Sequence, residues 1–207
     1  MTCKTLPELK IQGTKLIRYM VSKGYKVRAL NIVYLEGLNA TDWRVNADRI
    51  DEWNDVRVVV GDDGSVYMSA TATTEPGWHY RLQRMNERGA AQIAFGQYLN
   101  AWGFGKHFKQ DALVQCGTIK VFRDHNEDGS RQGDLPYTGA DYCINQHTTG
   151  NDSDAGAPGT VGRWSAGCLV GKHPSTHYDT FLPLCRSMGL KTFDTTVVDG
   201  SDFSKFK

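Results

Sequence analysis

Apolar residues recur along this chain with two different periods, and the change between them divides it into predicted elements. Beyond Thr5 and Pro7, apolar residues recur every three or four positions, which predicts a helix that ends near Gly24. Thr5 is its predicted cap, and Pro7 lies in its first turn. Its apolar stripe consists of Leu9, Leu16, Ile17, Met20 and Val21. Residues 26–35 follow as a run of β-branched and aromatic side chains, a pattern typical of a strand.

Strand patterns dominate the middle of the chain. Residues 56–60 and 65–70 carry alternating apolar positions on either side of an Asp-Gly turn, and this arrangement predicts a β-hairpin. Residues 91–98 favour a further strand, and residues 112–121 predict a strand pair that turns at Cys116-Gly117.

Two helices and one more strand complete the expected elements. Asn46-Ala47-Asp48 is typical of a short helix start through Trp53, and a longer helix is expected from Ser175 to Met188. Residues 192–198 favour a final strand, followed by a tail over residues 199–207. The sequence therefore predicts a mainly β, α+β fold. It is expected to form a single catalytic domain over residues 1–207, with residues 1–25 as a helical extension packed on it.

Composition narrows the classes of function. The net charge is only +1 and no block of basic residues occurs, so nucleic acid is not an expected partner. No stretch has the roughly 18 consecutive apolar residues of a membrane span. The N-terminal residues do not resemble a secretory signal, so synthesis in a cytoplasm is expected. The five cysteines are scattered without a CxxC pair, as suits a reducing compartment, and nothing in the pattern indicates the oligomeric state.

The stretch from His147 to Val170 carries the candidate chemistry. If residues 142–145 and 168–170 are paired strands, the Gly- and Asp-rich loop between them returns the chain so that the His147 imidazole meets the Cys168 thiol. A thiol becomes a nucleophile when a base accepts its proton. Small residues beside the thiol keep backbone N–H groups accessible, so that these groups can donate hydrogen bonds to an oxyanion. The plainer alternative is a buried structural cysteine and a solvated loop histidine.

The order of these residues resembles a family signature. His147, a spacer, and then Ser165, any residue, Gly167 and Cys168 is similar to the motif of the L,D-transpeptidase catalytic domain. The resemblance implies Cys168 as nucleophile, His147 as its base, a helper role for Thr148 in orienting the histidine, and a turn formed by Ser165 and Gly167. The family's second histidine is Ala166 here, and its polar residue two positions after the cysteine is Val170.

The same resemblance implies a fold and a substrate. Members of that family are β-sandwich or barrel enzymes that act on peptidoglycan stem peptides through an acyl-cysteine, without a metal or organic cofactor. A phage-type lysin that hydrolyses the stem peptide and reaches the bacterial wall without its own signal is the expected form. Two alternatives remain open: an L,D-transpeptidase that forms cross-links, and a catalytically inactive wall-binding or virion structural protein.

Other residues are candidates for binding. Candidate substrate contacts are Trp164, Arg163, Arg131, His107 and Glu75. Asp124, Asn126, Asp128 and Gly129 match the first half of a calcium loop, although its twelfth position is Leu135 instead of a glutamate. A polar hairpin loop without metal explains the same residues, and a calcium-dependent adhesion domain is the functional alternative. His173 and His177 are candidates to replace the missing second histidine.

Overall fold

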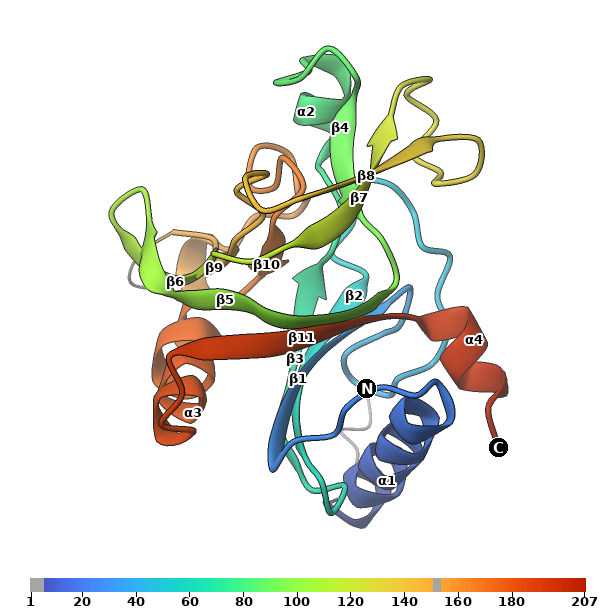
Figure 1. Cartoon of the computed structure of the whole chain (residues 1–207), viewed down its shortest axis with the longest axis vertical. Coiled ribbons are helices and arrows are strands. Elements are labelled where there is room, and N and C mark those ends of the chain that lie inside the picture. Colours follow the sequence, from blue (N-terminus) through green and yellow to red (C-terminus); the bar gives the residue numbers. More distant parts are fainter. Residues whose placement is uncertain (1–5, 151–153) are drawn as a thin grey trace.

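The computed structural model describes residues 6–150 and 154–207. Most of its strands close into one barrel, in the order β1-β11-β5-β6-β9-β10-β3-β2 (Figure 1). These strands are β1 (Leu30–Glu36), β2 (Asp55–Gly61), β3 (Val66–Thr73), β5 (Gly96–His107), β6 (Gln110–Gln115), β9 (Gln146–Thr148), β10 (Leu169–Gly171) and β11 (Thr192–Asp199). The pairs β1–β11 and β9–β10 are parallel, and the other neighbours in the barrel are antiparallel.

A three-stranded sheet stands beside the barrel. It consists of β4 (Ala90–Ile93), β7 (Ile119–Asp124) and β8 (Leu135–Gly139), with the short helix α2 (Trp78–Leu82) near its end (Figure 1). The predicted mainly β, α+β class is confirmed, and so is the hairpin of β2 and β3.

The prediction that residues 112–121 form a strand pair is wrong. β6 pairs with β5 and β9, whereas β7 pairs with β4 and β8 in the other sheet. The backbone amides of Cys116 and Gly117 both donate to the carbonyl of Ala101, at 2.9 and 3.1 Å. These two hydrogen bonds direct the chain out of the barrel. The turn at Cys116-Gly117 therefore connects a barrel strand to a strand of the second sheet and does not close a hairpin.

The remaining helices flank the barrel. α1 (Leu6–Ser22) matches the predicted N-terminal helix, and the predicted cap Thr5 lies outside the described residues. A π-helical turn (Thr176–Phe181) leads into α3 (Leu182–Ser187), which agrees with the helix expected at residues 175–188. The expected C-terminal tail is instead helix α4 (Gly200–Lys205), because the Asp199 side chain accepts from the amides of Ser201 and Asp202 and so caps it.

The short helix expected from Asn46 to Trp53 is absent from this part of the described chain. The Asn46 side chain accepts from the Asp48 amide at 2.8 Å, and both Asp48 and Asp51 have positive φ angles of 46° and 67°. Local bonds of this kind compete with helix formation. The segment is therefore an irregular connection.

Two apolar cores explain why β1 and β2 carry apolar residues on both of their faces. Ile32, Tyr34 and Val59 join a core with Trp102 and Leu113. The alternate residues of the same strands face a second core beneath α1 and α4, which contains Val33, Leu35, Val56, Val58, Leu16, Met20 and Phe203. Both faces of these strands are therefore buried, each against a different core.

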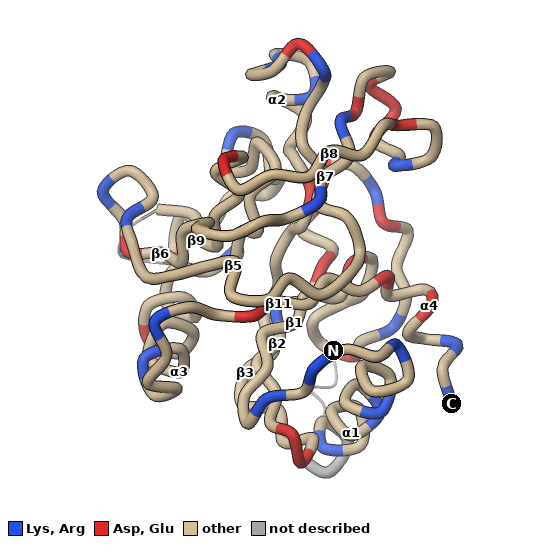
Figure 2. The backbone as a smooth tube through the Cα atoms, viewed as in Figure 1, with Lys and Arg blue, Asp and Glu red and all other residues tan. Residues whose placement is uncertain are grey.

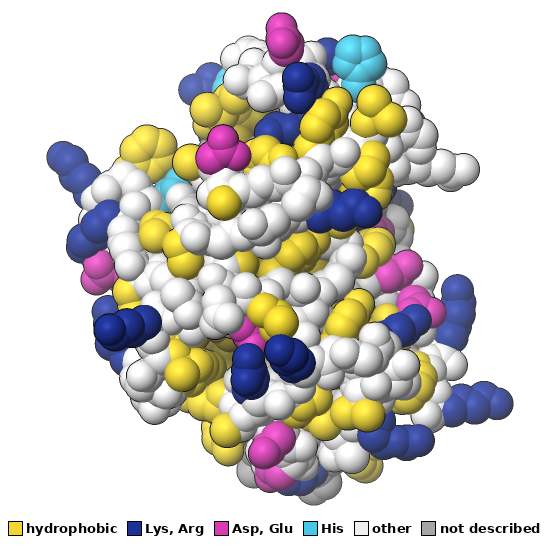
Figure 3. Space-filling model, viewed as in Figure 1, with side chains coloured by type: hydrophobic (Ala, Val, Ile, Leu, Met, Phe, Trp, Pro, Cys, Tyr) yellow, Lys and Arg dark blue, Asp and Glu magenta, His cyan; other side chains and the backbone are white. Residues whose placement is uncertain are grey.

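Charges do not gather on one face. Lys and Arg as well as Asp and Glu occur in many different parts of the backbone (Figure 2), and on the face in Figure 3 polar side chains divide the hydrophobic ones into small patches. No helix in the described ranges is long and apolar enough to cross a membrane.

Candidate active site

Parallel pairing of β9 and β10 brings the histidine and the cysteine together. Val170 lies opposite His147, and the Leu169 amide donates to the Asn145 carbonyl at 2.9 Å. The expected neighbouring strands are therefore present. The expectation that residues 142–145 form one of them is wrong: Cys143 has a φ of 56°, which breaks the extended backbone, and the strand begins only at Gln146.

His147 has the tautomer that a base requires. Its ring is buried, and Nδ1 lies 3.0 Å from the Thr148 carbonyl, which can only accept. Nδ1 therefore carries the proton and Nε2 carries the lone pair. Nε2 is buried and has no hydrogen-bond partner. Thr148 thus orients the ring through its main chain, because its hydroxyl donates to the Gly171 carbonyl instead.

His107 stacks on His147. The two rings are nearly parallel, at 10°, with their centroids 3.9 Å apart. The Asn145 side-chain oxygen accepts from the Gln115 amide at 3.0 Å, so its Nδ2 donates to Nδ1 of His107, also at 3.0 Å. This contact fixes the His107 ring, which the long β5–β6 hairpin carries to the site. Burial lowers the pKa of His107.

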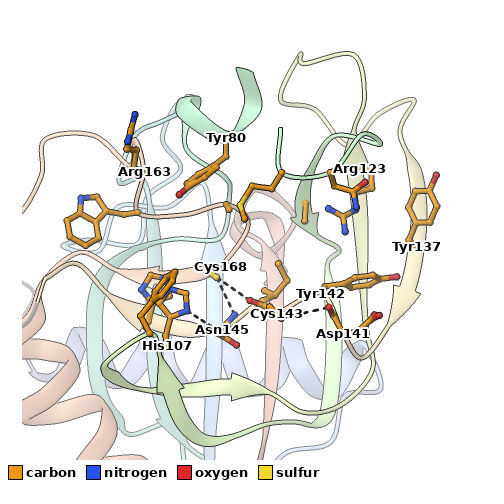
Figure 4. A pocket seen from close by; sticks show the side chains of 18 of the residues that line it. Tyr80, His107, Arg123, Tyr137, Asp141, Tyr142, Cys143, Asn145, Arg163 and Cys168 are labelled. Atoms are coloured by element: carbon orange, nitrogen blue, oxygen red, sulfur yellow. Dashed lines mark hydrogen bonds between the residues drawn. The ribbon is translucent and has the colours of Figure 1, made fainter. Parts of the chain in front are cut away.

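The Cys168 thiol is buried at the foot of the cleft. Its sulfur lies 3.4 Å from the donating amide of Asn145 and 3.5 Å from the carbonyl of Cys143, to which the thiol donates (Figure 4). Burial raises the pKa of Cys168 to about 11. Burial first, and then the neighbouring His107, lowers the pKa of His147 to about 3. The resting pair is therefore a neutral thiol beside a neutral imidazole.

The turn before Cys168 is built from Ser165 and Gly167. The Ser165 hydroxyl donates to the Cys168 carbonyl at 2.9 Å and accepts from the Gly167 amide at 3.1 Å. Gly167 has a φ of 125°, and a Cβ there would lie 2.5 Å from the Ala91 carbonyl. Only glycine fits this position. Because its amide is already bonded, Gly167 shapes the turn and leaves no N–H free for an oxyanion.

A buried arginine lies beneath the pair. Arg57 on β2 is 2% exposed, and its Nη2 donates to the carbonyls of His147 and Leu169, at 2.9 and 3.1 Å. Its Nη1 lies 3.0 Å from Nδ1 of His177, whose Nε2 lies 3.0 Å from the Asp111 carbonyl. His177 therefore donates from Nε2 and accepts at Nδ1. The arginine therefore links the segments that carry His147 and Leu169 to strand β2 through hydrogen bonds.

The thiol opens into a cleft of about 620 Å³ between the barrel and the three-stranded sheet. His107, Trp164 and Arg163 line it, as expected for substrate contacts, and so do Tyr80, Arg123, Tyr137 and Tyr142 (Figure 4). Trp164 is 36% exposed. The opening is large enough for a peptide-sized ligand.

Two predicted contacts do not line this cleft. Arg131 binds both carboxylate oxygens of Glu36, at 2.5 and 2.6 Å, and Glu75 is buried against Gln92 and Arg81. Both line a separate cavity of about 460 Å³. Arg131 and Glu75 therefore bind other residues of the protein, because each contacts a buried group of opposite charge or a buried amide.

The calcium-loop residues do not converge on one point. Asp124 is buried and forms an ion pair with Arg81, while Asn126 bonds to Asp128 at 2.7 Å on the exposed part of the loop. The first carboxylate of the motif is therefore occupied by a guanidinium. The polar-loop alternative fits these contacts.

One group of described residues has the spacing of a metal site. His107, His147 and Cys168 each offer a ligand atom, and these atoms lie within 4.8 Å of one another. Nitrogen and thiolate ligands suit zinc. Nε2 of His147 is set for this role because Nδ1–H donates to a carbonyl, but Nδ1 of His107 accepts from Asn145, and a ligand bond there would displace that amide.

Sequence reasoning missed part of the site. Asn145 and Arg57 were not expected in it, and the second imidazole is His107 instead of His173 or His177. His173 lies 3.9 Å from Asp154, and His177 is buried on Arg57. The basic residue inside a strongly apolar strand, Arg57 within residues 56–60, was the available signal.

Comparisons with protein-family models, with curated proteins and with solved structures each give no match for this chain. What the site can do therefore follows from its geometry and from the motif.

Proposed function

We propose that this protein is a cysteine-dependent peptidase that opens peptidoglycan stem peptides through an acyl-cysteine. The observation that carries the proposal is the lone pair on Nε2 of His147, which is buried without a hydrogen-bond partner, on a ring that has a nitrogen within 4.8 Å of the Cys168 sulfur. A peptide-sized cleft opens directly beside them. The stem peptide as substrate comes from the resemblance of the motif.

The chemistry starts from the neutral pair. As sulfur attacks the peptide carbonyl, the thiol proton passes to Nε2 of His147, and the carbonyl oxygen becomes an oxyanion. The Gly167 amide is bonded to Ser165, so the Cys168 amide is the group expected to donate to that oxyanion. The C–N bond then breaks, and the leaving amine takes the proton from His147. Water attacks the thioester carbonyl while His147 accepts its proton. The C–S bond then breaks, the carboxylic acid product departs, and the thiolate takes the proton back from His147.

An L,D-transpeptidase-like arrangement is part of this proposal. The barrel places the cysteine just before one strand and the histidine within its parallel neighbour, which supports it. In this chain His107 supplies the second imidazole, in place of the residue that the motif has at Ala166. Its stacked ring limits rotation of the His147 ring.

The acceptor decides the outcome. Water gives a hydrolase that acts on the bacterial wall, as in host lysis or in a virion-associated role, whereas an amine gives a transpeptidase. Muropeptide analysis separates them: hydrolysis yields new free amines or shortened stems, and transfer yields cross-links or exchanged terminal residues.

The first prediction concerns Cys168. Replacing the nucleophile with Ala should lower turnover of muropeptides roughly 10⁴-fold or more, because no acyl-enzyme can form. Cys168→Ser should lose nearly as much. Cys116→Ser, an exposed thiol outside the cleft, should keep parental turnover. Turnover that survives in Cys168→Ala rules out the proposal, and a parent without Cys168-dependent product points to a binding or structural protein.

A second candidate is a zinc-dependent hydrolase, which the His107–His147–Cys168 group favours. In that case the sulfur is a ligand and not a nucleophile. A chelator should then abolish turnover, and added zinc should restore it. Under the thiol mechanism, chelation leaves turnover intact while iodoacetamide removes it.

A further inference from the structure

Two arginines stand on the wall of the cleft that the three-stranded sheet provides. The guanidinium carbon of Arg123 lies 5.4 Å from the ring centroid of Tyr142, and that of Arg88 lies 5.0 Å from the centroid of Tyr137. All four residues line the cleft that contains Cys168. Figure 4 shows Arg123 with both tyrosines on one side of Cys168.

The sheet holds this pair close to the nucleophile. Ala91 lies opposite Arg123 in the β4–β7 ladder, and its carbonyl is the atom that a Cβ on Gly167 would meet. The turn before Cys168 therefore packs directly against the strand next to Arg123. Arg88 precedes that strand by one residue, Gly89, whose carbonyl accepts from Arg123 at 3.4 Å.

Neither arginine has a carboxylate partner among the described residues. Arg81, Arg84 and Arg131 form ion pairs with Asp124, Glu127 and Glu36, but no ion pair involves Arg88 or Arg123. Burial lowers the pKa of Arg123, and the nearby Arg88 lowers it further, whereas Tyr142 and Tyr137 raise it. The acidic residue that lines the cleft is Asp141, which is exposed.

We propose that Arg88 and Arg123 form a subsite for a carboxylate of the ligand. Guanidinium groups bind carboxylates through two parallel hydrogen bonds, and the tyrosine rings keep both planes in place before the ligand arrives. A bound carboxylate relieves the repulsion between the two cations. The assignment rests on the proposed function only in placing the ligand's reacting carbonyl at Cys168.

Binding to the Cys168→Ala variant tests the subsite without turnover. The probes are a stem tetrapeptide with free carboxylates and the same peptide with every carboxylate amidated, both measured by isothermal titration calorimetry. The acid should bind about 10- to 100-fold more tightly than the amide, the range for charge-assisted hydrogen bonds. Salt should reduce this preference, since screening weakens exposed charge pairs.

Variants locate the effect. Replacing both arginines, as Arg88→Gln with Arg123→Gln, should remove the preference for the acid. The matched control is Arg186→Gln, because Arg186 also stacks on an aromatic ring, Phe104, but lies outside the cleft. It should keep the preference. If the double variant does not fold, Arg88→Gln alone serves, since that side chain is exposed.

Equal binding of acid and amide overturns the subsite, and so does a preference that survives in the arginine variants. This result is distinct from failure of the proposed function. If turnover does not depend on Cys168 while the arginines still select the acid, the subsite stands and the thiol mechanism falls.

Discussion

Two arginines are almost completely buried in this protein, and their surroundings differ. Arg81 contacts carboxylates, with Asp124 in an ion pair and Glu75 at 3.8 Å. Arg57 contacts no carboxylate in the described chain and donates instead to the carbonyls of His147 and Leu169. Both side chains are 2% exposed or less.

The difference separates a structural centre from a candidate reactive one. Around Arg81, the buried cation and the buried Asp124 carboxylate compensate each other, so removal of one leaves an unpaired charge. Around Arg57, the cation holds the two strands that carry the thiol and the imidazole while both groups stay neutral. The fold should depend most on the first arginine, and turnover should depend most on the second.

The largest effect on stability is expected at Arg81. Arg81→Met leaves the buried Asp124 carboxylate without its cation, and the free energy of unfolding should fall by roughly 3–5 kcal/mol. Arg84→Met is the matched control, because its pair with Glu127 is partly exposed, and it should cost about 1 kcal/mol or less. Urea denaturation measures both. Equal losses for the two variants would show that burial of the pair is unimportant.

The reactivity of Cys168 should reflect its burial. The pKa is raised from 9.0 to about 11, so at pH 8 the thiolate fraction is about 100-fold below that of an ordinary thiol. Alkylation by iodoacetamide, followed at this residue by mass spectrometry with N-acetylcysteine as reference, should be slower by about that factor and still rising at pH 10. A plateau between pH 6 and 8 would indicate a preformed thiolate–imidazolium pair instead.

Loss of Arg57 should act mainly on catalysis. In Arg57→Met the His147 and Leu169 carbonyls lose their buried donor, which should cost about 1–3 kcal/mol in the free energy of unfolding. The resulting displacement of His147 and Cys168 should lower kcat by about 10- to 100-fold. Arg57→Lys keeps the charge but not the fork of donors, and it should recover little of kcat. Unchanged kcat with reduced stability would place Arg57 beside Arg81 as a purely structural residue.

The two centres should respond to pH in opposite directions. In the centre around Arg81, burial, and then Glu36, raises the pKa of Glu75. The folded state therefore binds this proton more tightly, and stability falls as pH rises above about 4, the unfolded value. Burial lowers the pKa of His147 and of His177 to about 3, so their contribution is lost as pH falls from about 6.5 to 3.

A single substitution tests the first of these slopes. Glu75→Gln should reduce the loss of stability between pH 5 and 8, because one of the carboxyls that must ionise in a buried setting is gone. Thermal unfolding across this range measures the change. An unchanged slope would mean that Glu75 is already ionised in the folded protein at pH 5.

The sequence predicted the parts of the fold that depend on local patterns. The α1 stripe, the β2–β3 hairpin and the pairing around His147 and Cys168 each follow from neighbouring residues. The β6–β7 connection was misread because its outcome depends on a distant acceptor, the Ala101 carbonyl, which no local pattern reveals. The helix α4 was missed because Asp199 looks like an ordinary strand-end residue until its cap bonds form.

The site divides in the same way. Cys168, His147 and the turn residues lie close enough in sequence to be recognised as one motif. His107, Arg57, Arg123 and Arg88 come from separate parts of the chain, and only the closed barrel and the second sheet bring them near. Arg131 and Glu75 were misplaced because a charged residue in a loop gives no indication of a buried partner of opposite charge.

The parallel arrangement of β9 and β10 has a consequence for how this protein can diversify. The barrel fixes both His147 and Cys168, so exposed positions of the intervening segment, such as Gly156, Gly159 and Thr160, can vary in composition without moving either one. Sequence changes can therefore accumulate at these positions while the arrangement of the histidine and the cysteine is inherited unchanged.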